Sequence, residues 1–85
     1  MAGFIKYATV ADGGTYTMPS NGYLIIGANG ATATVKINLN ETGSADNYDF
    51  TETVADATAK AVPFKLPQGA VLTFTGTEVK LIAYD

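Results

Sequence analysis

Apolar and polar residues alternate with a period of two over much of this chain, a pattern typical of β-strands with one buried face. The clearest case is residues 32–39, where Ala, Val, Ile and Leu occupy one face and Thr, Lys and Asn the other. This segment is expected to place one side in the core and one in water. Residues 22–28 are apolar on both faces, which predicts a central strand buried on both sides.

Turn residues separate these segments at nearly regular intervals. Asn29-Gly30 lies between two apolar runs, and this dipeptide predicts a tight hairpin that joins residues 22–28 to residues 32–39. Residues 18–22 and 66–69 share the order apolar residue, Pro, polar turn, Gly, followed by a strand. The same turn chemistry is therefore expected twice, at one end of the fold.

The rest of the chain is less regular. Residues 62–66 alternate with Pro63 on the outward face, which predicts an edge strand. Residues 40–47 read as a long polar loop, and residues 48–61 fit either a strand plus a loop or a short helix over residues 51–61. The other predicted strands are residues 3–10, 15–18, 70–75 and 78–84.

Seven or eight short strands with turns between them predict an all-β fold. The expected architecture is a small antiparallel β-sandwich or jelly roll, with residues 1–85 forming a single domain.

The chain is short for a domain that folds alone, and small domains usually add disulfides, a metal or partner subunits. It contains no Cys and no His, so disulfides and the usual zinc sites are excluded. We therefore expect a homo-oligomer. Four side chains on the terminal strands occupy faces that a lone sandwich would expose, and they are the candidates for a subunit interface: Ile5, Tyr7, Ile82 and Tyr84.

Charge excludes several classes of partner. The net charge is −3, and all five basic residues are Lys, so neither nucleic acid nor an anionic membrane surface is an expected partner. No apolar run approaches the roughly 20 residues of a membrane helix. The N-terminal residues 1–6 lack a basic region followed by a long apolar core, so we expect synthesis in a cytoplasm without a secretory signal.

The chain shows no catalytic constellation, and we expect no enzyme activity, cofactor or metal. A nucleophile needs a nearby base, and neither Ser-His-Asp nor Cys-His is available. The glycines match no phosphate-binding loop. Five carboxylates gather in one third of the chain and favour a solvated acidic loop over a Ca²⁺ site: Glu41, Asp46, Asp49, Glu52 and Asp56.

Several motifs together resemble small β-sandwich modules of bacteriophage virions, such as head-decoration proteins, head fibres and tail-fibre tips. They are the run from Tyr16 to Leu24 with its Pro-Ser-Asn-Gly turn, the strand at residues 32–38, the run from Val62 to Phe74 with its Pro-Gln-Gly turn, and the final Ile82-Ala83-Tyr84. Such modules are commonly jelly rolls that assemble as trimers.

The resemblance implies a structural role on a virion, with synthesis in the host cytoplasm. The expected function is capsid decoration: a homotrimer that binds the major capsid protein on the outside of the shell. The alternative is a receptor- or carbohydrate-binding module at a fibre tip, with exposed tyrosines on loops, such as Tyr48. The chain has no Trp and no Arg, residues that receptor-binding tips often display, which favours decoration.

Overall fold

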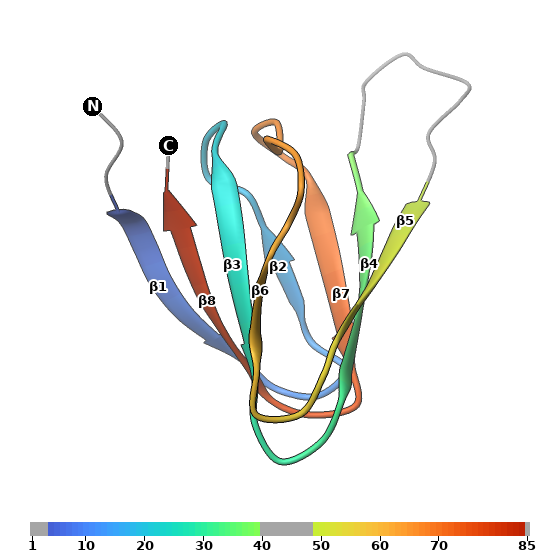
Figure 1. Cartoon of the computed structure of the whole chain (residues 1–85). Helices are drawn as coiled ribbons and strands as arrows, with labels where there is room; N and C mark the ends of the chain where they lie inside the picture. Colours follow the sequence, from blue (N-terminus) through green and yellow to red (C-terminus); the bar gives the residue numbers. More distant parts are fainter. Residues whose placement is uncertain (1–3, 40–48, 85) are drawn as a thin grey trace.

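Eight strands and no helix make up the part of the chain that the computed structural model describes, residues 4–39 and 49–84, with side chains from residue 8 onward (Figure 1). The strands are β1 (Phe4–Val10), β2 (Thr15–Thr17), β3 (Tyr23–Ala28), β4 (Ala33–Asn38), β5 (Asp49–Val54), β6 (Ala59–Ala61), β7 (Val71–Thr75) and β8 (Val79–Tyr84). They form two four-stranded antiparallel sheets, in the orders β1-β8-β3-β6 and β2-β7-β4-β5. The predicted all-β class and antiparallel sandwich are confirmed.

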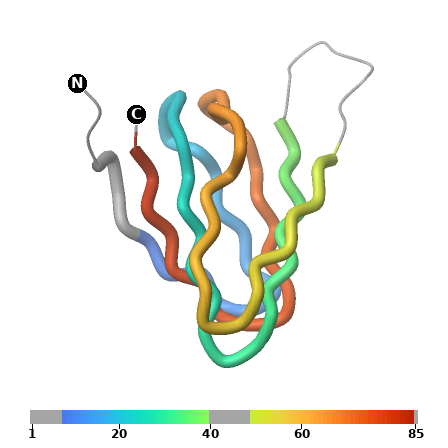
Figure 2. Tube along the Cα trace, viewed as in Figure 1, coloured from blue at the N-terminus to red at the C-terminus, as the bar shows by residue number. Residues whose placement is uncertain are grey.

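The pairing is that of a long antiparallel hairpin rolled up on itself. β1 pairs with β8, β2 with β7, β3 with β6 and β4 with β5. Two further ladders, β3–β8 and β4–β7, join these pairs into the two sheets. This is the order of an eight-stranded jelly roll. Figure 2 follows the path, in which β4 and β5 are the only consecutive strands of the described chain that share a sheet.

The predicted hairpin at Asn29-Gly30 does not form. β3 and β4 belong to different sheets, so the loop between them is a corner that crosses from one sheet to the other. Gly30 has a φ of 107°, but Asn29 has no positive φ, and a type I′ turn needs it at both positions. The prediction is wrong because turn chemistry reverses the chain without determining which strands pair afterwards.

The predicted edge strand at residues 62–66 is displaced along the chain. β6 forms earlier, at Ala59–Ala61, and pairs with β3 as the last strand of its sheet, so the edge position is right. Residues 62–66 continue along β3 irregularly, with the Val62 amide donating to the Leu24 carbonyl. Residues 49–61 form a strand, a turn and a second strand, and not the short helix that was the alternative. The predicted loop at residues 40–47 lies outside the described residues.

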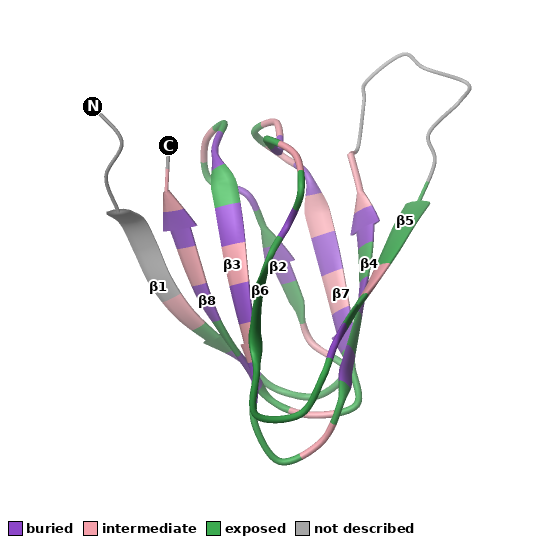
Figure 3. Cartoon of the chain, in the orientation of Figure 1, coloured by how far each residue is buried: buried purple, intermediate pink, exposed green. Residues whose placement is uncertain are grey.

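The inward residues of both sheets form one core (Figure 3). Burial alternates along β4 and β8 as predicted. β3 is central in its sheet but differs from its prediction, because Leu24, Ile26 and Ala28 are buried whereas Tyr23 and Ile25 face outward and are partly exposed. The largest fully buried side chains are Phe74, Met18, Leu24, Ile26, Ile37, Leu66, Leu72, Leu81, Val35, Val54 and Val79.

The two proline-containing turns lie side by side at the end of the sandwich that carries both termini (Figure 1). The Met18 amide donates to the Ala70 carbonyl, and the Gly69 amide donates to the Met18 carbonyl. The Gln68 amide also donates to Asn21 Oδ1 at 2.7 Å. The expectation that these similar turns occupy one end of the fold is confirmed.

Candidate functional site

The outward surface of the β2-β7-β4-β5 sheet is dominated by hydroxyl groups. Cross-strand partners share a face, and the ladders pair Thr15 with Thr73, Thr34 with Thr75, and Thr34 with Thr53. The outward threonines of this sheet are Thr15, Thr17, Thr34, Thr51, Thr53, Thr73 and Thr75. We call this surface the threonine face. Threonine suits a strand and keeps its hydroxyl available to water, so this face is compatible with solvent.

The outward surface of the β1-β8-β3-β6 sheet is apolar by comparison. In its ladders Tyr23 pairs with Tyr84, and Ile25 pairs with Ile82. Three of these side chains are half-buried, whereas Tyr23 is 37% exposed. We call the surface formed by Tyr23, Ile25, Gly27, Ile82 and Tyr84 the apolar face. Its position on the outside of the sandwich makes it the candidate site for contact with another protein.

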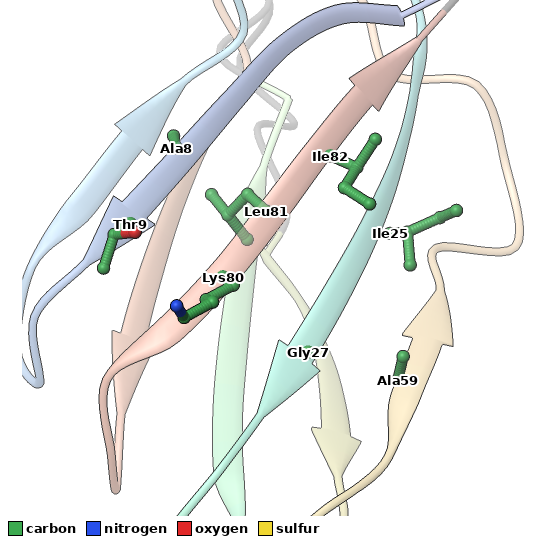
Figure 4. Close-up of a pocket in the computed structure, with 8 residues that line it drawn as sticks. All are labelled: Ala8, Thr9, Ile25, Gly27, Ala59, Lys80, Leu81 and Ile82. Carbon is green, nitrogen blue, oxygen red and sulfur yellow. The ribbon is translucent and has the colours of Figure 1, made fainter.

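A hollow of about 490 Å³ lies in the apolar face (Figure 4). Ile25, Ile82 and Lys80 surround it, while Gly27 and Ala59, which pair with each other across the ladder, contribute almost no side-chain volume. A Cβ added at Gly27 would meet only the Lys80 carbonyl oxygen at 3.7 Å, an ordinary contact. The backbone therefore does not require glycine at position 27, and the missing side chain keeps the hollow open.

Aromatic rings extend the apolar face toward the end that carries the termini. The rings of Tyr23 and Tyr84 stack with centroids 5.5 Å apart and an interplanar angle of 28°. The Nζ atom of Lys65 lies 5.9 Å from the Tyr23 ring centroid, within reach of a cation–π interaction. A smaller hollow of about 290 Å³ lies beside this group, lined by Asn21, Lys65, Leu66 and Pro67.

A second aromatic pair is exposed on the side of the sandwich where β5 and β6 form the sheet edges. Phe50 is 43% exposed, and its ring centroid lies 5.4 Å from that of Phe64. The neighbouring Asp49 accepts a hydrogen bond from the Asn38 amide at 2.8 Å. We call Phe50 and Phe64 the β5 edge patch. Asp49 points to the opposite side of β5 and shares the threonine face with Thr51 and Thr53.

The four predicted interface residues have different outcomes. Ile82 and Tyr84 lie on the apolar face, where the structure brings them together with β3. Tyr7 pairs with Ile82 in the backbone ladder, and Ile5 falls at the register shift between Phe4 and Lys6. The side chains of Ile5 and Tyr7 lie outside the described set. A subunit contact through these strands remains a prediction.

The β3 half of the apolar face was missed from the sequence. Tyr23, Ile25 and Gly27 belong to the segment that the sequence predicts to be buried on both sides. The sequence pattern is compatible with this outcome, because a strand that is apolar on both faces can leave one apolar face uncovered. Gly27 and Ala59 gave no signal, because the space they leave depends on the pairing of β3 with β6.

The three described carboxylates of the predicted acidic group have separate partners. Asp49 binds Asn38, Glu52 lies 2.7 Å from Lys60, and Asp56 accepts a hydrogen bond from the Gly30 amide at 2.8 Å. Glu41 and Asp46 lie outside the described residues. Among residues 4–39 and 49–84, no group of three potential metal ligands is found.

One titratable group of the described chain has a clearly shifted pKa. Burial raises the pKa of the Tyr16 hydroxyl above 10.0, because desolvation disfavours the phenolate. Tyr16 belongs to the core cluster, and its hydroxyl has no hydrogen-bond partner among the described atoms. Its environment is that of a packed side chain.

No family model and no curated protein match the chain. The described residues contain no helix long and apolar enough to span a membrane. The C-terminal domain of A223, a structural protein from sulfolobus turreted icosahedral virus, is similar over 100% of this chain and 98% of that domain. The identity is 22% and the TM-score 0.48.

Proposed function

We propose that this chain is a structural protein of a virus particle that works by protein–protein contact through its apolar face. The observation that carries this proposal is the contrast between its two outer surfaces. The threonine face presents hydroxyl groups, whereas the apolar face presents stacked tyrosines, two isoleucines and an open hollow. A small protein that leaves an apolar surface on one side uses it for binding.

The virion assignment draws on the resemblance of the turn and strand motifs to bacteriophage virion modules. The proposed role is decoration of the outer shell, as a homotrimer made in the host cytoplasm, with the major capsid protein as the partner. The two turns that carry the resemblance are hydrogen-bonded to each other at one end of the jelly roll. In this proposal the protein acts by binding to the shell, and no catalytic step is assigned.

Uptake by bare shells tests the proposal. Shells of the parent particle are mixed with purified protein, and the bound protein is measured after sedimentation. We expect saturation at a fixed number of copies per shell subunit, and the absence of saturable uptake would overturn the decoration role.

Two matched lysine substitutions test the use of the apolar face. Gly27→Lys fills the hollow without a backbone clash and should abolish uptake. Thr34→Lys places the same charge on the threonine face and should bind as the wild type does. Equal uptake by both variants would exclude the apolar face from the contact.

The geometry also favours a second function, glycan binding at a fibre tip. The exposed Tyr23 ring lies next to Lys65 and to the hollow that Asn21 helps to line. Aromatic faces and amide groups suit a sugar ring and its hydroxyls. A glycan screen would show binding that Tyr23→Ala removes. Tyr48, the loop tyrosine expected for this function, lies outside the described residues.

A further inference from the structure

We propose that the capsid-protein segment bound on the apolar face places a large apolar side chain in the hollow and a neighbouring carboxylate on Lys80. This inference rests on the proposed function and deepens it, because it names the chemistry of the partner segment at that face. Lys80 is then the residue that selects the segment by its charge.

The hollow is built from a row of residues that crosses all four strands of the sheet. In the backbone ladders Thr9 pairs with Lys80, Lys80 with Gly27, and Gly27 with Ala59. Figure 4 shows these four residues side by side. Apart from Lys80 their side chains are small, whereas the next row toward the tyrosines contains the isoleucine pair of the apolar face. The hollow is therefore a step down in the sheet surface, with Lys80 at its rim.

The lining of the hollow suits an apolar side chain. Isoleucine side chains form its wall, and Gly27 and Ala59 leave its floor open. Its volume of about 490 Å³ lies within the range of about 300–1,000 Å³ that holds whole small ligands, so one large side chain fits inside. Filling the hollow removes apolar surface of both proteins from water, which favours binding.

The charge of Lys80 is not balanced within the described part of the chain. The side chain is exposed, and the ion pair found among the described residues joins Lys60 to Glu52. Glu78 lies in the turn before β8 and does not line the hollow. An apolar side chain seated beside Lys80 displaces water from its ammonium group. A shielded ammonium needs an anionic partner, and a carboxylate next to the apolar side chain supplies one.

The sheet as a whole has the same preference. The protein has a net charge of −3, yet the four strands of the β1-β8-β3-β6 sheet contain no Asp and no Glu. In the other sheet, β5 alone carries Asp49 and Glu52. A partner segment with a basic residue at the hollow would oppose Lys80 with a like charge, as would a second apolar face. The apolar face therefore favours a segment that is apolar and acidic.

Charge reversal at two matched lysines tests the role of Lys80 in shell uptake. Lys36 is exposed on the threonine face, between Thr73 and Thr51 in the ladders, and its reversal changes the net charge equally. Lys80→Glu should bind shells at least about tenfold more weakly than the wild type. Lys36→Glu should differ from the wild type by less than about twofold.

The neutral variant Lys80→Gln separates lost attraction from new repulsion. It should bind between the wild type and Lys80→Glu, and its binding should depend less on salt than that of the wild type. Circular dichroism melts establish that each variant is folded. Wild-type uptake that is matched by both Lys80 variants would overturn this inference and leave the proposed function standing. Absence of wild-type uptake would overturn the proposed function and this inference with it.

Zero-length cross-linking identifies the partner group directly. A carbodiimide joins an amine to a carboxylate only where the two groups touch. Decorated shells treated in this way should yield a peptide pair that links Lys80 to an Asp or Glu of the major capsid protein, with a large apolar residue beside it. Lys36 should yield none. Saturated shells in which Lys80 is not linked to the capsid protein would overturn the inference.

A charge exchange across the contact completes the test. The capsid carboxylate found by cross-linking is replaced by lysine, and shells carrying that change are mixed with each form of the protein. They should take up Lys80→Glu better than the wild type, because the exchange restores opposite charges. Shells that still prefer the wild type would contradict a contact between Lys80 and that carboxylate.

Discussion

Gly22 and Leu66 exchange a pair of backbone hydrogen bonds, 2.9 Å and 2.7 Å long, that join the two proline-containing turns. The Leu66 side chain is fully buried in the core. It ends the irregular segment after β6, where an isolated bridge between Gly22 and Leu66 takes the place of a regular ladder. The packing of Leu66 therefore fixes both turns against the sandwich.

Leu66→Ala should lower the free energy of unfolding by about 2–5 kcal/mol, because it leaves a cavity under both turns. Urea denaturation at a fixed protein concentration measures the loss. Gln68→Ala is the matched control, since its side chain is exposed and its backbone amide still donates to Asn21. The control should change stability by less than about 0.5 kcal/mol. Equal losses in both variants would show that Leu66 has no special role.

Gly76 should tolerate alanine much less well than Gly69, although both have positive φ angles of 113° and 89°. At Gly69 a Cβ meets nothing within 4 Å, so alanine adds only backbone strain of about 1–2 kcal/mol. At Gly76 the Cβ would collide with the Thr32 carbonyl, and the Gly76 amide also bonds to Asp12 Oδ1 at 2.9 Å. Thermal melts should place Gly76→Ala at least about 2 kcal/mol below Gly69→Ala. The reverse order would contradict the close approach of the two corners.

The fold class could be read from local patterns because core-facing strands impose their period on the sequence. Residues 33–38 alternate between buried and exposed as their composition predicts. Strand pairing could not be read in the same way. Asn29-Gly30 reverses the chain, but β3 and β4 join different sheets. β6 lacks any large apolar residue, and its hydrogen bonds to β3 make it a strand.

The candidate site could be predicted only where single residues carry the signal. Ile82 and Tyr84 were identified because they are apolar at outward positions of the final strand. Gly27 and Ala59 have no distinguishing chemistry, and the hollow they leave exists only after β3 and β6 pair. Phe50 alternates in phase with buried Val54, yet the edge position of β5 leaves it exposed.

Lys60 and Glu52 should make a small, salt-sensitive contribution to stability. Their 2.7 Å contact joins β6 to β5 across the two sheets, but the side chains are 48% and 24% exposed. A double-mutant cycle with Lys60→Gln and Glu52→Gln should give a coupling of about 0.2–1 kcal/mol that falls as salt is raised. A coupling that is unchanged in high salt would contradict an exposed ion pair.

Tyr16→Phe should leave the free energy of unfolding unchanged or raise it by up to about 1 kcal/mol. The hydroxyl is buried without a partner among the described atoms, so removing it removes a desolvation cost while the ring stays packed. Urea denaturation at neutral pH provides the comparison. A clear loss of stability in the variant would reveal a hydrogen bond to the hydroxyl in the native protein.

The same pair of proteins should diverge at alkaline pH. Burial raises the pKa of Tyr16 in the folded state above 10.0, so well below pH 10 the phenol is neutral in both states and does not change stability with pH. As pH approaches and passes 10 the unfolded chain releases the proton first, and the folded state loses stability until its own pKa is passed. The wild type should therefore lose stability faster than Tyr16→Phe as pH rises above 10. Parallel pH profiles for the two proteins would mean that the Tyr16 hydroxyl ionises as easily in the folded protein as in the unfolded chain.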